Sequence, residues 1–441
     1  MIADAPVGAP ERRDHVGFFG LAEFHLGEIV WQFTCGRGSV RTLNGCRILD
    51  TGSVISVISV ISVSSVSCVS SVSLSVASSA TASIGVLRTS SPTFRAKTNF
   101  MTRTFMKFAV APLIILLFAT SLQAQDRLPI IDVHLHALAA DAQGPPPLAM
   151  CTPFVDMPTW DGPGPYGATF MMFMKNPPCD DPVWSPETDE EVMEQSLEIL
   201  ERRNIIAVVS GSLERVATWR AGAPDRLIPG LSFNVVRDAG VTPDSIRSLV
   251  DAGALEVFGE VTNQYSGISP NDERMEPYWA LAEELQIPVG IHIGPGPPGV
   301  IYLGSSDYRA RMHSALTMEE VLVRHPRLRV YIMHAGYPML DDLLAVLYAH
   351  PQVYLDVGVI VYSVPRPAFY RYLQGIVDAG FVKRVMFGSD QMTWPGTIER
   401  ALAVINEAPF LSDEQTRDIL YNNAARFFRL TEEEIERHHG M

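Results

Sequence analysis

Eight short runs of apolar residues, many of them β-branched, recur between residues 129 and 390 and alternate with helical patterns. Each run is almost continuously hydrophobic, as expected of strands that are buried on both faces. Strands that alternate with helices over this length are typical of a (β/α)8 barrel, the TIM-barrel fold. We therefore predict this α/β fold, with strands at 129–135, 205–211, 227–233, 255–261, 288–294, 328–334, 352–358 and 384–390.

Helix starts between these runs carry a recognisable signature, in which Ser or Thr is followed three residues later by Glu or Gln. The alternative fold, an open doubly wound sheet, would need a glycine-rich turn after its first strand. The sequence at that point, HLHALAADAQGPPP, contains no such turn, so the barrel is favoured. Three helix starts carry the Ser/Thr signature described above, which is called a capping box: Thr188 with Glu191, Thr317 with Glu320, and Ser412 with Gln415.

The connection after the first strand, residues 137–187, is much longer than the others and rich in Pro, Gly, Met and aromatic residues. Long loops in compact domains are usually functional or disordered, and this composition favours a packed segment. We predict a lid over the barrel mouth. The loop contains Cys151 and Cys179, for which a disulfide and two free thiols are both open.

The first 124 residues do not resemble the barrel that follows. Residues 1–100 include a low-complexity Ser/Val segment and are interpreted as a non-native extension. Residues 101–124 combine a basic start, a short apolar core and a small-residue cleavage site, which predicts a signal peptide. The alternative is a genuine extension with one membrane anchor. With cleavage, residues 125–441 form an exported, periplasmic or secreted catalytic domain without a stable membrane span.

Residues 125–441 contain 24 Lys and Arg against 43 Asp and Glu, a formal charge of −19. This acidic balance disfavours nucleic acid as a partner, because it repels phosphate backbones. We expect a small-molecule substrate, and the oligomeric state is left open between a monomer and a homo-oligomer.

Ligand-type side chains end several of the predicted strands. His134 and His136 follow each other at alternating positions of the first strand and share one face. Active sites of such barrels lie where the carboxyl ends of the strands meet. Imidazole and carboxylate groups gathered there suit a divalent metal, with zinc as the leading candidate. The further candidates end the fourth, fifth, sixth and eighth strands: Glu260, His292, His334 and Asp390.

Taken in this order, the motifs resemble the amidohydrolase superfamily, and more closely its amidohydrolase-related (amidohydrolase 2) branch of metal-dependent TIM-barrel hydrolases. The similarity covers about residues 128–430 and is carried by IIDVHLHA, YIMHAGYPML, FGSDQMTWP and ILYNNAARFFRL. The resemblance implies metal ligation by His134, His136, His292 and Asp390. His334 would then ligate a second metal or polarise the substrate. Glu260 would either bridge two metals or lie outside a site that holds one. A carboxylated lysine bridge is excluded, because Lys175 and Lys383, the only lysines after residue 124, lie elsewhere.

The leading hypothesis is hydrolysis of an amide, ester or lactone-type bond by metal-activated water, with Asp390 as general base and His334 as polarising group. Tyr265 and Arg366 are candidate substrate-binding residues. Asp132 is expected to orient a ligand imidazole. Asp356 and Tyr265 are looser candidates, for which ordinary packing or a place on the polar rim is expected. One alternative is metal-dependent non-oxidative decarboxylation of an aromatic or unsaturated acid, which an arginine at the mouth would favour. The other is a non-catalytic, exported metal-binding protein.

Overall fold

The computed structural model describes residues 128–441. The predicted extension at 1–100 and the predicted signal peptide at 101–124 lie outside the described residues. Within the described part, no helix is both long and apolar enough to cross a membrane.

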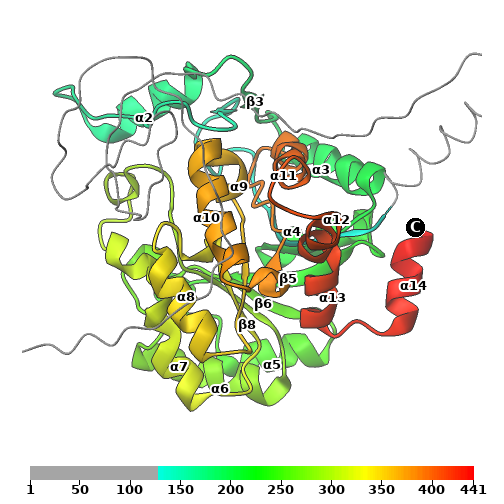
Figure 1. Cartoon of the computed structure of the whole chain (residues 1–441). Helices are drawn as coiled ribbons and strands as arrows, with labels where there is room; N and C mark the ends of the chain where they lie inside the picture. The colour runs from blue at the N-terminus through cyan, green and yellow to red at the C-terminus, as the bar shows by residue number, and fades with distance from the viewer. Residues whose placement is uncertain (1–127) are drawn as a thin grey trace, which may run out of the picture. The chain divides into compact units, whose positions relative to one another are not determined.

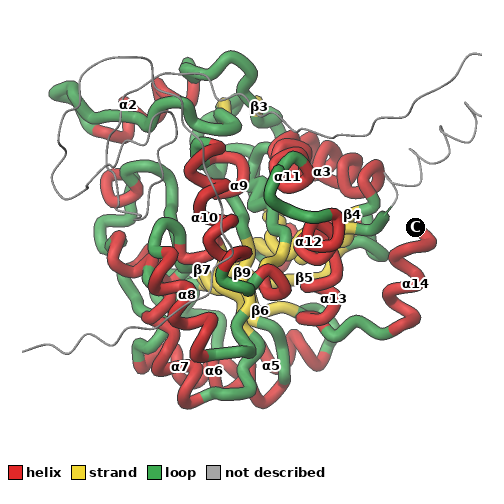
Figure 2. Tube along the Cα trace, in the orientation of Figure 1, coloured by secondary structure: helices red, strands yellow, loops and turns green. Residues whose placement is uncertain are grey.

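Eight parallel strands form the centre of the molecule, with helices around them (Figures 1 and 2). Each strand pairs with the next along the chain. The segment that follows the last strand is joined to the first strand by hydrogen bonds from Val133 N to Phe387 O (3.0 Å) and from Asp390 N to His134 O (2.7 Å), so the barrel is nearly closed. The predicted fold is confirmed. The strands are β1 (Ile130–Ala137), β4 (Ile205–Gly211), β5 (Leu227–Phe233), β6 (Val257–Val261), β7 (Val289–His292), β8 (Val330–Met333), β9 (Tyr354–Asp356) and β10 (Val385–Met386).

The later strands leave the sheet earlier than the sequence predicts. The run at 384–390, for example, pairs only over Val385–Met386. His334 and Asp390, which follow β8 and β10, have φ angles of +60° and +50°. This left-handed conformation is uncommon outside glycine and ends an extended strand. The backbone therefore turns at the residues that carry ligand-type side chains.

Helices connect the strands and cover the outside of the barrel (Figure 2). The predicted capping boxes of Thr188 and Ser412 are confirmed. The one at Thr317 is wrong, because this hydroxyl donates to Ser314 O and the segment begins as a 3-10 turn capped by Ser314. The α-helices are α2 (Tyr166–Lys175), α3 (Asp189–Arg203), α4 (Leu213–Gly222), α5 (Pro243–Asp251), α6 (Glu276–Leu285), α7 (Glu319–Arg324), α8 (Leu340–Ala349), α9 (Ile360–Ser363), α10 (Arg366–Asp378), α11 (Gly396–Asn406), α12 (Asp413–Arg417), α13 (Asn423–Phe428) and α14 (Glu432–Gly440).

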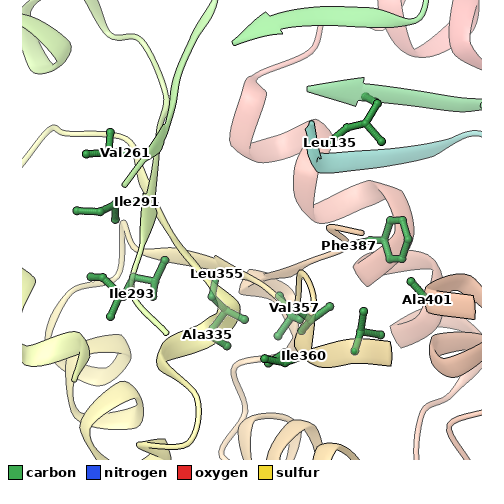
Figure 3. Packing of buried hydrophobic residues seen from close by; sticks show 14 of the residues in the cluster. Leu135, Val261, Ile291, Ile293, Ala335, Leu355, Val357, Ile360, Phe387 and Ala401 are labelled. Atoms are coloured by element: carbon green, nitrogen blue, oxygen red, sulfur yellow. The ribbon is translucent and has the colours of Figure 1, made fainter. Parts of the chain in front are cut away.

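Two apolar clusters hold these layers together. The larger one lies between strands and outer helices and includes Leu135, Phe387 and Ala401 (Figure 3). The smaller one includes Tyr331, whose hydroxyl donates to Val133 O of β1 at 2.9 Å. Because β1 and β8 are not neighbours, this side chain crosses the barrel interior. Apolar side chains therefore fill part of the interior, and the polar cluster lies at the carboxyl ends of the strands.

The long segment between β1 and α3 is folded. It contains α2 and a short antiparallel pair, β2 (Ala149–Met150) with β3 (Val183–Trp184). Tyr166 donates to Pro298 O at 2.8 Å, Phe154 N donates to Ser363 O, and Trp394 donates to Leu148 O. These contacts reach the connections after β7, β9 and β10, so the segment packs on the carboxyl-end face. That it acts as a lid stays a prediction.

Cys151 and Cys179 form a disulfide within this segment, which decides between the two alternatives that the sequence left open. The bond links residues 28 positions apart. By restricting the unfolded chain, a loop of this length stabilises a fold by about 3 kcal/mol. We expect reduction to lower the free energy of unfolding by about that amount, measured by urea denaturation with and without reductant. The Cys151→Ser/Cys179→Ser protein should not respond to reductant, and an equal response would contradict the prediction.

Candidate metal centre

Six predicted residues come together at the carboxyl ends of the strands: His134, His136, Glu260, His292, His334 and Asp390. All six are buried. His136 Nε2 lies 3.1 Å from His134 Nε2, 3.1 Å from Asp390 Oδ1 and 3.5 Å from Glu260 Oε2. Glu260 Oε1 lies 3.7 Å from His334 Nε2 and 4.0 Å from His292 Nε2. The six side chains therefore form one compact cluster.

Two of the imidazoles are held from outside the cluster by the β9 end. His134 Nδ1 lies 3.0 Å from Asp356 Oδ2, and His334 Nδ1 lies 2.9 Å from Gly358 O. Both acceptors require a proton on Nδ1, so in the neutral form of each imidazole the lone pair lies on Nε2. In each ring Nδ1 is the outer nitrogen, which points away from the cluster, and Nε2 is the inner nitrogen, which points into it. An outer nitrogen that donates to a carboxylate or carbonyl is typical of metal-ligating histidines.

The other two imidazoles are oriented in the same way. His292 Nδ1 lies 2.9 Å from Gln264 Oε1, and His136 Nδ1 lies 3.2 Å from Ser210 Oγ. His292 Nε2 contacts the hydroxyl of Tyr265 at 3.0 Å. All four outer nitrogens thus have partners beyond the cluster, and the inner nitrogens of His134, His136 and His334 point at other ligand-type atoms.

The inner nitrogen atoms fit a bound cation. His334 Nε2 is buried and has no hydrogen-bond partner. The Nε2 atoms of His134 and His136 face each other at 3.1 Å, where two lone pairs would repel without a proton or cation. Two overlapping groups have three donor atoms within 4.8 Å of one another: His134, His136 and Asp390, and His134, Glu260 and His334. Nitrogen and carboxylate donors of this kind suit zinc and related divalent ions.

Charge balance in the metal-free cluster rests on the histidines. Burial would lower the pKa of His134, but Asp390, Asp356 and Glu260 raise it to about 10. Burial would likewise lower the pKa of His334, and the nearby Glu260 and Asp390 raise it instead. The pKa of His292 falls to about 3, through burial and the charge of His334. Burial alone would raise the pKa of Asp390, but His134 and His136 lower it below its ordinary value, so this carboxylate is ionised.

These shifts predict proton release on metal binding. The raised pKa of His134 favours a second proton on this ring, on Nε2, and a metal bound at Nε2 must displace that second proton. Apparent affinity should therefore rise with pH, by about tenfold per unit for each proton released. Titration calorimetry between about pH 6.5 and 8.5, in two buffers of different ionisation enthalpy, would measure the release. Affinity that stays constant across this range would contradict the assignment.

Glycine is required beside the cluster. A Cβ atom on Gly358 would lie 2.7 Å from His134 Nδ1 and 3.0 Å from the Cβ atom of Asp390. Non-glycine residues with positive φ, such as His334 and Asp390, are costly and are retained where the surrounding structure enforces them. The local backbone is therefore shaped around the two side chains.

The structure places the other sequence candidates differently. Tyr265, in the 3-10 turn η1 (Asn263–Ser266), lies at the cluster against His292. Arg366 does not join it: this half-buried side chain pairs with Glu407 at 3.6 Å and lies over the Tyr370 ring. Asp132 does not hold an imidazole, because its Oδ1 accepts from the backbone N–H groups of His134 and Ser389. A register shift in β1 after Asp132 breaks the alternation on which that prediction depended.

The residue that holds His134 is Asp356, for which ordinary packing was expected. It is fully buried, and its Oδ1 also accepts from His334 N at 3.0 Å and Gly358 N at 2.8 Å. An Asp at the end of an otherwise apolar strand was the available signal. Gln264 and Ser210 carried no comparable sequence signal.

A sequence profile described as amidohydrolase matches residues 131–430, and the chain belongs to this family. The family's members are enzymes, among them hydrolases and decarboxylases, and they typically bind a divalent metal. No curated protein matches the chain in sequence.

Solved structures similar to this chain share little sequence with it. A TIM-barrel protein from Bordetella bronchiseptica is 18% identical, with 71% of this chain and 100% of that chain covered and a TM-score of 0.47. A probable 2-pyrone-4,6-dicarboxylic acid hydrolase from Acinetobacter baumannii is 14% identical, with coverage of 68% and 99% and a TM-score of 0.46. The 5-carboxyvanillate decarboxylase of Sphingomonas paucimobilis is 14% identical, with coverage of 69% and 100% and a TM-score of 0.42.

Proposed function

We propose that this protein is a metal-dependent hydrolase of a small molecule and cleaves an amide, ester or lactone-type bond. The observation that carries the proposal is the convergence of inner imidazole nitrogens with Glu260 and Asp390, each imidazole being held at its outer nitrogen. His134, His136 and Asp390 would hold one divalent ion, with Glu260, His334 and His292 available for a second or for substrate. A bound ion would lower the pKa of water towards about 7.

The protein's own groups would carry the proton and orient the substrate. Asp390 is ionised and buried at the cluster, so it can take the proton of the attacking water and deliver it to the leaving group. His334, whose pKa is raised, can donate to a carbonyl oxygen as charge develops there. Tyr265 stays protonated, because burial and the charge of Glu260 raise the pKa of its hydroxyl. It can therefore donate a second hydrogen bond to the substrate.

Three observations bear on the choice between hydrolysis and decarboxylation. Glu260 lies within the cluster, where it can bridge two ions, and Arg366 lies outside it; both favour hydrolysis. Arg237 favours the second candidate, decarboxylation of an aromatic or unsaturated acid. Its positive charge acts on Tyr265 and partly offsets the rise in the pKa of that hydroxyl, which makes Arg237 the candidate cation for a substrate carboxylate.

The reaction can be decided with two product measurements on the metal-loaded enzyme. Amides, esters, lactones and aromatic carboxylic acids would be screened in water enriched in oxygen-18. Hydrolysis incorporates the label into the product, whereas decarboxylation releases carbon dioxide. We expect label incorporation without carbon dioxide, and carbon dioxide release from an acid substrate would replace the proposal with the second candidate.

We also propose that the protein is exported after cleavage before Gln125. The sequence pattern of residues 101–124 supports this. N-terminal sequencing of protein recovered outside the cytoplasm should begin at Gln125, and an uncleaved N-terminus in that fraction would contradict it.

A further inference from the structure

A hollow lies at the amino-terminal end of the barrel strands, opposite the end that carries the candidate metal centre. It has a volume of about 670 Å³ and is lined by residues just before β5, β6, β7 and β8 and by the chain from α13 into α14. The amino-end face of such barrels usually serves stability, and the metal centre lies at the other end. The hollow therefore belongs to a different part of the molecule from the proposed active site.

Arginines dominate the charge of this basal cleft. Five arginines line it against three carboxylates, which leaves two positive charges in excess within a strongly acidic domain. Arg220 pairs with Glu256 at 3.5 Å. Among residues 128–441, no carboxylate lies within ion-pair distance of the other four arginines, although Glu434 interacts with Arg437 and Glu201 and Asp225 interact with Arg226 at longer range. These four are Arg226, Arg329, Arg429 and Arg437.

Two of these guanidinium groups are brought together by one glutamine. Arg329 donates to Gln286 O at 2.8 Å, and Arg429 donates to the Gln286 side-chain oxygen at 3.3 Å. Burial and the neighbouring charge of Arg429 lower the pKa of Arg329 to about 10. Arg329 also donates to Phe427 O, and Arg429 has donors left over. Two guanidinium groups that repel each other beside a hollow are stabilised by an anion with several oxygen acceptors.

We propose that the basal cleft binds a small organic anion with two or more negative charges, held by Arg329, Arg429 and Arg437. Guanidinium groups suit carboxylate and phosphate oxygens equally, through paired N–H donors. The volume exceeds the need of an inorganic ion and leaves room for an organic body. Binding here would occur without contact with the metal centre.

The test uses the metal-loaded full chain, with inorganic phosphate and succinate as probes at constant ionic strength. Arg429 and Arg437 are exposed, so the Arg429→Gln/Arg437→Gln protein should fold normally. The control, Arg311→Gln/Arg371→Gln, removes the same charge from exposed arginines that do not line the cleft. Titration calorimetry should show wild-type binding of at least one probe and at least tenfold weaker binding in the cleft variant. The control should bind as wild type.

Three results would overturn the proposal. If the wild type binds neither phosphate nor succinate, the basal cleft is not an anion-binding site. Binding that persists in the cleft variant would belong to the metal centre or another place. Equal weakening in the control would show a general effect of net charge. Preference between phosphate and succinate would identify the chemical source of the anion.

Discussion

Replacing Asp390 by Asn is expected to lower kcat by about 10²- to 10⁴-fold, the range that a positioned general base contributes. The substitution keeps the shape of the side chain but removes the charge that can take a proton. Asp390 Oδ1 lies 3.1 Å from His136 Nε2, so the variant should also bind metal more weakly. The measurement is steady-state turnover at saturating metal, with the bound metal determined in the same sample.

A matched control separates this effect from a general disturbance of the fold. Asp418 is also buried, but its Oδ1 accepts a hydrogen bond from Asn422 and contacts none of the cluster. Asp418→Asn should leave kcat within about twofold of wild type. An Asp390→Asn protein with full metal and near-normal kcat would assign the base to another residue.

The second large effect is expected from Asp356→Asn. Asp356 uses one oxygen for two backbone N–H groups, those of His334 and Gly358, and the other for His134 Nδ1. An Asn that keeps its oxygen on the backbone side turns its NH₂ group towards Nδ1. His134 would then carry its proton on Nε2 and lose the lone pair that binds metal. We expect metal affinity to fall by about 10- to 100-fold, measured by competition with a chelator.

Asp132→Asn is the matched control, because Asp132 is equally buried and contacts only backbone around the cluster. Its Oδ1 accepts both N–H groups, and its Oδ2 has no partner. Burial raises the pKa of Asp132 to about 6, which means that the protein stabilises its charge poorly, so the neutral amide of Asn should be tolerated. Metal affinity should stay within about threefold of wild type, well inside the loss expected of a removed outer partner. A loss as large as that of Asp356→Asn would mean that the two carboxylates act alike.

The barrel could be predicted from sequence because its strands are apolar, short and regularly spaced. The residues that end those strands could also be predicted, since parallel strands bring their carboxyl ends to one face. His134 and Glu260 are 126 positions apart in the sequence, yet His134 Nε2 lies 4.0 Å from Glu260 Oε1 in the fold. The order of the strands alone was enough to expect this proximity.

The partners of the imidazoles could not be predicted in the same way. Which carboxylate reaches His134 depends on a register shift within β1 and on the backbone turn after β9. Neither feature has a periodic pattern, and strict alternation pointed to Asp132 instead of Asp356. That Arg366 lies outside the cluster could not be predicted either, because sequence distance from a strand end does not fix the direction of a side chain in the first turn of a helix.

The most direct test of the account is the metal content of purified protein after metal-replete expression. We predict at least one equivalent of divalent metal per wild-type chain and less than about a tenth of an equivalent in His134→Ala/His136→Ala, because metal sites need their nitrogen ligands. Glu260→Gln, measured alongside, should lose one of two equivalents if Glu260 bridges and none if the site holds one ion. Wild-type protein without metal, or a double variant with undiminished metal, would contradict the central claim.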